Sequence, residues 1–390
     1  MPEVTASAPG LRSMFLSPGL LIAGVGAFAL STLFSAMKPV LLTRLLEETV
    51  WSESTAGMVV AVPFVGIAIS SLLFYLRPPN VALRKLAYVF GGLLVLLELL
   101  SAALFEQSVL LLGLQLTAGF CVGALMAATS RLLALSDTPD ESFGFVDMMA
   151  VALMSAMVSG ASISVAFLGV KGGYLFAAAL SSLYAMFVIS YREPPLSLSH
   201  HNAEQQALTL GVRPLAVVLM GVVFVTASGL GFVFLFSLAA RLGMDYQTAG
   251  LRLGALLLAS AAACQLGGWC SGRYGPRYPL LGAFIACALG WWIAVHTHNE
   301  WVFLVALVPA LFSLQFNFPI LLALAGSLDT HGRWAGIAAP LITSGFAWAA
   351  ICAGLLVEHY GFEMLGWATA LGMLLCICLL WPATRMTQAD

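Results

Sequence analysis

The chain has 390 residues, of which 61% are hydrophobic and only 9% are charged, and its mean hydropathy is +0.98. An average soluble domain carries about 25% charged residues, so this composition excludes a soluble fold and indicates a protein whose surface faces lipid. The net charge of −2 is close to neutral and gives no sign of a nucleic-acid partner or an acidic substrate.

Long apolar segments follow one another along the whole chain. A helix needs about 20 mostly apolar residues to cross a bilayer, and runs of that length are too long for the strands of a membrane barrel. Twelve segments meet this requirement, and each is expected to be a transmembrane helix: Pro18–Val40, Thr55–Leu76, Leu86–Phe105, Val109–Leu135, Phe143–Val170, Tyr174–Ser190, Pro214–Ala240, Ala249–Ser271, Pro279–Val295, Trp301–Ala325, Gly336–Val357 and Phe362–Trp381.

The N-terminal residues Met1–Ser17 are polar, and the apolar run after them has no convincing cleavage site. We therefore interpret that run as the first membrane helix and not as a removed signal. The seven cysteines all lie in apolar stretches without a CxxC pair, so they are expected to be packing residues. The sequence predicts no cofactor.

Basic residues are distributed unevenly between the two sides of the predicted bundle. With the N-terminus inside, 11 of the 16 Lys and Arg residues lie in cytoplasmic loops and 5 lie on or near the outer side. This bias predicts a multi-pass protein of the cell inner (plasma) membrane with both termini in the cytoplasm.

A polar segment, Tyr191–Pro214, divides the chain into two halves of similar length. We expect a six-helix half over 1–190, a central cytoplasmic loop over 191–213 and a second six-helix half over 214–390. The halves repeat each other weakly: the first outer loop ends WSESTAG (Trp51–Gly57), and its counterpart ends DYQTAG (Asp245–Gly250). Two further loop pairs match in the same order, which supports an internal duplication.

This organisation resembles the major facilitator superfamily over essentially the whole chain. The loop after the eighth helix, GGWCSGRYGPRY, keeps Gly268, Gly272, Arg273, Gly275 and Arg277 of that family's basic loop motif. The resemblance implies an all-α polytopic fold of twelve helices in two pseudo-symmetric halves, and a secondary transporter rather than an enzyme. It also implies that Arg273 and Arg277 form a cytoplasmic latch with helix C-termini and carboxylates, against the simpler alternative of a positive-inside loop.

In this family the halves rock around a cavity lined by helices 1, 4, 7 and 10. The polar residues that these helices offer for substrate binding are Ser35, Gln115, Thr226, Gln315 and Asn317. Amides, hydroxyls and the nearby phenylalanines suit a small, partly apolar organic solute. Hydrogen bonding between helices is the alternative role for the hydroxyl groups.

Four charged residues fall inside or near the apolar zone. Asp147 is a candidate for ion coupling, unless it pairs with a cytoplasmic arginine such as Arg131. Lys38 and Arg252 lie toward the outer side, where Lys38 is a gating candidate. Arg252 could clamp a carboxylate, which would make the solute an organic anion, or it could pair with Glu47, Asp245 or Glu358. Glu98, in the third helix, has no evident partner.

The sequence therefore predicts a monomeric carrier that moves a small-molecule solute across the bilayer by alternating access, with ion coupling expected. One alternative is a metal importer that uses the soft sulfur ligands of Met148, Met149, Met154 and Met157 for copper. Another is a sensor or assembly protein of the same fold that no longer transports. No GxxxxGK[ST] signature occurs, which argues against ATP-driven transport.

Overall fold

The protein is described here from a computed structural model that covers residues 18–76, 83–134, 139–189, 211–328 and 333–384. Some side chains within these ranges are not described, among them those of Ser35, Lys38 and Arg131. The described backbone is helical apart from short connections.

Twelve helices are labelled in chain order. Their bounds are α1 Pro18–Glu48, α2 Glu53–Leu76, α3 Leu83–Leu104, α4 Ser108–Ala134, α5 Pro139–Ile189, α6 Val212–Val233, α7 Leu235–Arg241, α8 Tyr246–Tyr274, α9 Arg277–His296, α10 Glu300–Gly326, α11 Arg333–Tyr360 and α12 Glu363–Thr384.

The labels and the predicted spans differ at two places. Helix α5 contains the fifth and sixth spans, which reverse direction at Gly169, where φ is +61°. The seventh span consists of α6 and the short α7, which are separated by Phe234. Among the described residues, nine segments are long and apolar enough to cross a membrane, one of them being the double α5, and two shorter apolar helices belong to α1 and α2. The nine long segments, the second span inside α5 and the two shorter helices together make the twelve spans that the sequence predicts.

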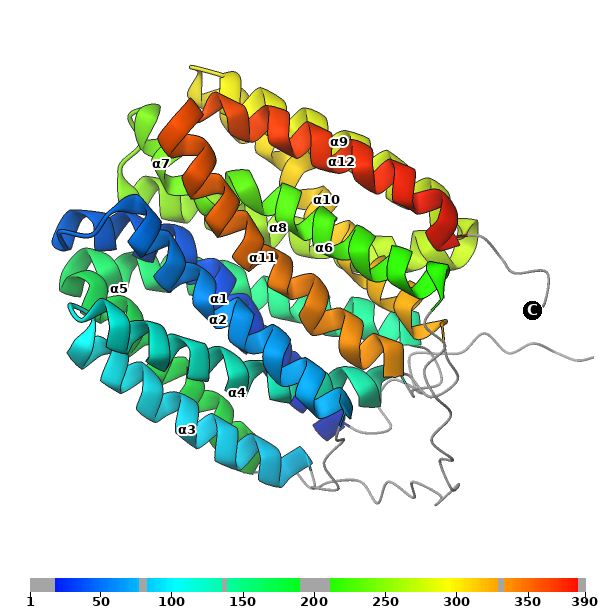
Figure 1. The fold of residues 1–390 in the computed structure, drawn as a ribbon, viewed down its shortest axis with the longest axis horizontal. Coiled ribbons are helices and arrows are strands. Elements are labelled where there is room, and N and C mark those ends of the chain that lie inside the picture. Colours follow the sequence, from blue (N-terminus) through cyan, green and yellow to red (C-terminus); the bar gives the residue numbers. More distant parts are fainter. Residues whose placement is uncertain (1–17, 77–82, 135–138, 190–210, 329–332, 385–390) are drawn as a thin grey trace, which may run out of the picture.

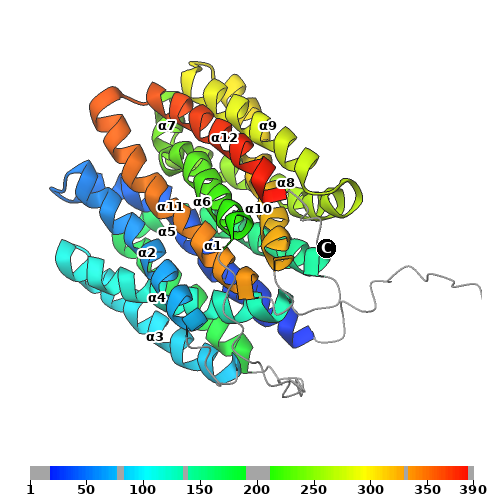
Figure 2. The same cartoon turned by 45° about the vertical axis from the view of Figure 1, so that its right-hand side comes forward.

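The helices form two bundles that lie side by side (Figures 1 and 2). Helices α1 to α5 make one bundle and α6 to α12 the other, with the main contacts between them made by α2 with α11 and by α5 with α8. The rings of Phe64 on α2 and Phe346 on α11 are 5.7 Å apart across this boundary. A cavity between the bundles would have to open along these two pairs of helices.

Helices α5 and α8 pack closely because small residues line their contact. Gly250 lies against Ser162 near the start of α8, and Gly144 lies against Gln265 toward its end. In the first bundle, Gly119 of α4 approaches the α2 backbone at Pro63 so closely that no Cβ would fit. Small residues at helix contacts are typical of membrane bundles, where backbones approach one another directly.

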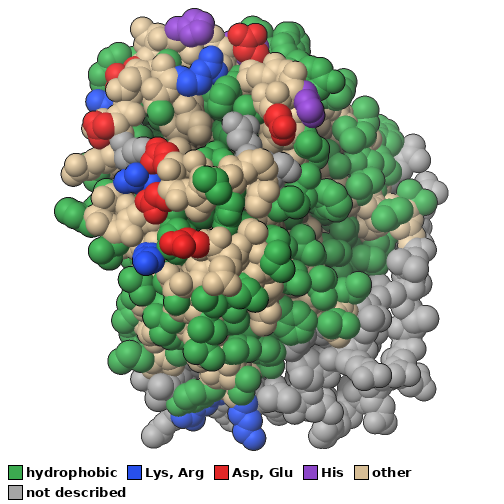
Figure 3. Space-filling view, turned by 60° about the vertical axis from the view of Figure 1, so that its left-hand side comes forward, with side chains coloured by type: hydrophobic (Ala, Val, Ile, Leu, Met, Phe, Trp, Pro, Cys, Tyr) green, Lys and Arg blue, Asp and Glu red, His purple; other side chains and the backbone are tan. Residues whose placement is uncertain are grey.

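The surface divides by polarity. Charged and histidine side chains gather over one end of the molecule, while hydrophobic side chains cover most of the area beside them (Figure 3). This is the distribution expected of a protein whose sides face acyl chains and whose ends face water.

Candidate functional site

Asn317 on α10 is the most completely buried of the predicted substrate-binding residues. Its exposed fraction is 0%, and neither its Nδ2 nor its Oδ1 atom has a hydrogen-bond partner among the described residues. Gln315 is also buried. A buried polar group without a partner costs about 1–3 kcal/mol, so Asn317 is a position at which a bound molecule would gain hydrogen bonds that the protein does not make.

The surroundings of Asn317 on α10 are aromatic and irregular. The rings of Phe312 and Phe316 stack with centroids 6.3 Å apart. Pro319 lies within the helix and has no N–H, so the backbone carbonyl of Gln315 loses its usual donor four residues later. A planar ring face, an unsatisfied amide and a carbonyl without its usual helical donor are therefore close together on one helix.

Asp147 lies where α5 meets α8, between the two halves. It is 3% exposed, the Cys264 thiol of α8 lies within hydrogen-bonding reach of its carboxyl group, and its Oδ2 atom has no partner. One turn away, the position of a Cβ on Gly144 is 3.4 Å from the Oε1 atom of Gln265, another acceptor without a partner. Arg131, the expected pairing residue, has a side chain outside the described part of the chain.

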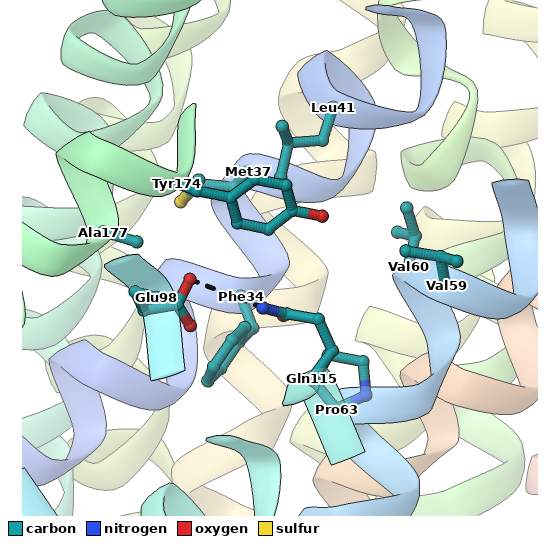
Figure 4. A pocket seen from close by; sticks show the side chains of 10 residues that line it. All are labelled: Phe34, Met37, Leu41, Val59, Val60, Pro63, Glu98, Gln115, Tyr174 and Ala177. Atoms are coloured by element: carbon teal, nitrogen blue, oxygen red, sulfur yellow. Dashed lines mark hydrogen bonds between the residues drawn. The ribbon is translucent and has the colours of Figure 1, made fainter. Parts of the chain in front are cut away.

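Gln115 is turned toward α3, a direction that its position in an apolar run does not indicate. Its Nε2 donates to the hydroxyl of Ser101 at 2.9 Å. It also donates to Oε2 of Glu98 at 3.4 Å (Figure 4). Glu98, which had no evident partner, is thus part of a buried polar cluster in the first half. Gln115 and Glu98 also line a small pocket with residues of α1, α2 and α5.

Arg252 forms an ion pair with Glu300, the first residue of α10, and its guanidinium also lies 5.7 Å from the centre of the Trp301 ring. The expectation that Asp245, Glu47 or Glu358 would be its partner is wrong. Asp245 instead caps α8 by accepting hydrogen bonds from the N–H and the hydroxyl of Thr248, both at 2.8 Å, and these bonds lower the pKa of Asp245. Glu300 is well placed because the N-terminus of a helix favours an acidic residue.

Thr226 on α6 uses its hydroxyl to join two helices. It donates to the carbonyls of Val222 at 2.7 Å and of Gly345 on α11 at 3.1 Å, which is the alternative role that the sequence left open. The residue also borders an apolar groove of about 590 Å³ between α6, α11 and α12. That groove opens to the outside of the bundle, because Trp348 and Leu355 on its wall are exposed.

The two arginines of the basic loop contact aromatic rings. Arg273 lies 5.7 Å from the ring of Trp269, and Arg277 lies 3.7 Å from the ring of Trp381 on α12. Both rings belong to the second half of the chain. Within the described residues the two arginines therefore make cation–π contacts, and their contacts with helix C-termini and carboxylates stay a prediction.

Two of the predicted substrate-binding residues lie at two different pockets of the described part of the chain. Gln115 lines the small pocket in the first half, Thr226 borders the outer groove, and Gln315 and Asn317 line neither of these two. Two further predicted residues, Ser35 and Lys38, have side chains outside the described residues.

The four methionines of α5 are divided between the interior and the surface. Met154 and Met157 belong to the apolar core, whereas Met149 is exposed, so the four sulfur atoms do not share one environment. This arrangement favours packing over a copper site.

The protein consists of two bundles of long apolar helices, and unsatisfied polar groups are buried inside each bundle and between the two. These features are those of a polytopic membrane transporter. The model of the Major Facilitator Superfamily matches residues 19–339, and the chain belongs to that family. No curated protein sequence matches the chain.

Solved structures confirm the fold at low sequence identity. A D-xylose-proton symporter is 14% identical with a TM-score of 0.75, and the alignment covers 97% of this chain and 99% of that one. The nucleoside transporter NupG is 13% identical with a TM-score of 0.73, covering 94% and 100%. The E. coli fucose:proton symporter FucP is 15% identical with a TM-score of 0.63, covering 95% and 99%.

Proposed function

We propose that this transporter moves a small, partly apolar and uncharged organic solute by alternating access, and that the solute binds to α10 at Gln315 and Asn317. The observation that carries the proposal is Asn317, whose amide is fully buried with both polar atoms unpaired. An amide both donates and accepts, as do the hydroxyl and amide groups of neutral polar solutes. The stacked rings of Phe312 and Phe316 would contact an apolar face of such a solute.

Arg252 lends no support to an anionic solute, because its guanidinium is already paired with Glu300. The similar solved structures are named for neutral hydroxylated solutes, namely a nucleoside, fucose and xylose. These three are therefore the first solutes to test.

A substitution of Asn317 by leucine separates a binding role from a structural one. If the amide serves a solute, Asn317→Leu removes an unsatisfied polar group, so the variant keeps or raises its melting temperature while transport is lost. Purified protein in vesicles would be assayed for uptake of labelled nucleosides, fucose and xylose, and for solute-induced thermal stabilisation. Thr117→Val, on an exposed face of α4, is the matched control and should transport normally.

Two results would contradict this site. Normal uptake by Asn317→Leu would exclude Asn317 from binding, and a lower melting temperature would mean that the amide stabilises the fold. If wild-type vesicles take up and bind none of the three solutes, the proposed solute class is wrong, and a sensor or assembly role would gain support.

We propose further that transport is coupled to an ion gradient through Asp147. Among the described side chains none forms an ion pair with Asp147, and an ionised carboxylate is costly to bury, so a bound proton or monovalent cation would stabilise it. Its place between α5 and α8 connects that binding event to the contact between the halves. Asp147→Asn should therefore lose accumulation against a gradient but keep solute exchange, and unchanged accumulation would rule out this role.

We also propose that both termini lie in the cytoplasm of a plasma-membrane protein. The bias of 11 basic residues to 5 supports this orientation, and α1 begins and α12 ends toward the same end of the molecule (Figure 1). Reporter fusions at Gln206 and Asp390 should both report a cytoplasmic location, and a signal from the outer side at either position would refute the topology.

A further inference from the structure

Glu98 is a buried carboxylate with incomplete hydrogen bonding. It is 1% exposed, and its Oε1 atom has no partner. Its Oε2 atom accepts one hydrogen bond from Gln115 at 3.4 Å. Hydrogen bonds from nitrogen to an ionised carboxylate are usually about 2.7–2.9 Å long, so this contact is a weak compensation for a charge.

Gln115 supplies Glu98 with a single donor. Its Nε2 atom carries two hydrogens, and the other one is donated to the Ser101 hydroxyl at 2.9 Å, the shorter of the two bonds. The Ser101 hydroxyl in turn donates to the Leu97 carbonyl at 2.8 Å and is not available to Glu98. The cluster therefore holds the carboxyl group in place without supplying the donors that an ionised carboxylate needs.

A small cavity adjoins the carboxyl group (Figure 4). Its volume is about 20 Å³, and Glu98, Gln115 and Tyr174 are its polar side chains. A space of this size with polar partners is enough for a single water molecule. Val59 also lines it, and because Pro63 has no N–H, the Val59 carbonyl lacks its usual helical donor.

The other groups that face this cavity carry no charge. Helix α1 contributes Phe34, Met37 and Leu41, α2 contributes Val59, Val60 and Pro63, and α5 contributes Tyr174 and Ala177. Tyr174 is the titratable group among them. Helix α1 also contains Lys38, whose side chain lies outside the described residues.

The geometry points to Glu98 as a reversible proton-binding site in the first half, which exchanges its proton through one water molecule in the adjoining cavity. A proton arrives at that water position as a hydronium ion: one O–H bond of the hydronium breaks, an O–H bond forms on Oε1, and a neutral water molecule remains. The neutral carboxyl group then donates this O–H to an acceptor in the cavity, and release of the proton to the water reverses the step. An ionised carboxylate with one free oxygen in an apolar enclosure is disfavoured relative to its neutral form, so the site binds a proton readily.

The position of the site suggests where the proton comes from. Glu98 lies six residues before the end of α3 at Leu104, which is about 9 Å along the helix axis. With the topology proposed above, that end is the outer one. Helices α1, α2, α4 and α5 all meet at this cavity, and α2 packs against α11 of the other half. Protonation of Glu98 can thereby affect the contact between the halves, a consequence that rests on the proposed transport function.

Infrared difference spectroscopy of the purified protein in lipid would test the site directly. We expect the C=O band of a protonated carboxylic acid that disappears reversibly as the pH is raised. Glu98→Gln should lose this band, Glu98→Asp should restore a titrating band, and Asp147→Asn should retain the Glu98 band. Gln115→Leu should move the midpoint of its titration, whereas Thr117→Val should leave it in place.

The results separate this inference from the proposed function. If Glu98→Gln leaves every titrating carboxylic-acid band in place, or if Asp147→Asn removes the band instead, Glu98 is not the proton site. If the band belongs to Glu98 but wild-type vesicles move no solute, the proton site stands and the transport function fails. If vesicles transport solute, Glu98→Gln should lose the pH dependence of uptake, and an unchanged pH profile would overturn the link to transport.

Discussion

The reversal of α5 at Gly169 depends on a residue without a side chain. Its φ of +61° and ψ of −151° lie in a region that essentially only glycine occupies. The next residue, Val170, donates its N–H to Oε2 of Glu48 at 3.1 Å, so a carboxylate at the end of α1 caps the start of the sixth span. A Cβ on Gly169 would collide with that same carboxylate.

Gly169→Ala should therefore destabilise the protein in two ways. Placing alanine in this backbone conformation costs about 1–3 kcal/mol. Displacing Glu48 from the helix N-terminus removes a capping bond worth about 1 kcal/mol, for a total of about 2–4 kcal/mol. In a Glu48→Ala background the capping bond is already absent, so the same substitution should cost only the backbone strain.

Thermal unfolding of the purified protein in detergent, at one fixed heating rate, would measure these effects. Gly92→Ala is the matched control, because Gly92 lies within α3 and an added Cβ meets nothing within 4 Å. Alanine at that position should be neutral or stabilising by up to about 1 kcal/mol. If Gly169→Ala melts no lower than Gly92→Ala, the assignment of strain to this turn is wrong.

Three further predictions concern other contacts. Arg252→Lys should keep the ion pair with Glu300 and transport nearly normally, whereas Arg252→Ala should lower the melting temperature. A weakened solute affinity in Arg252→Lys would instead support Arg252 as a clamp for a solute carboxylate. Gly119→Ala should destabilise the contact between α2 and α4, as seen in its melting temperature, while Gly113→Ala, where an added Cβ meets nothing, should not. Hydrogen bonds hold the pKa of Asp245 below 3.8, so the stability that its capping contributes is complete at neutral pH. That stability is lost as the pH falls through the lowered pKa. Asp245→Ala should therefore flatten the dependence of unfolding on acid pH.

The membrane spans could be predicted from the sequence because their length and composition leave no alternative. The predicted third span, Leu86–Phe105, differs from α3 by three residues at one end and one at the other. The turn between the fifth and sixth spans was placed near Gly172 and Gly173, whereas the chain reverses at Gly169. Gly169, Gly172 and Gly173 lie close together there, and the sequence does not indicate which of them adopts the positive φ.

The partners of the polar residues could not be predicted, for a reason specific to membranes. In a soluble helix the polar face marks the outside, but here both the buried and the lipid-facing sides are apolar. The sequence therefore indicates how deep in the membrane Arg252 and Glu98 lie, but not which neighbouring helix each of them faces. The pairs of Arg252 with Glu300 and of Glu98 with Gln115 follow from helix packing alone.

Three buried polar groups without full hydrogen bonding lie in three different parts of the protein: Glu98 within the first half, Asp147 between the halves and Asn317 within the second half. At about 1–3 kcal/mol each they cost about 3–9 kcal/mol, which is comparable with the 5–15 kcal/mol that separates a typical folded protein from its unfolded state. A protein that served only as a scaffold would be more stable with apolar residues at these positions. A transporter that binds protons or ions at two of them and a solute at the third would recover part of this free energy at successive steps, and each binding event would then favour a different arrangement of the halves.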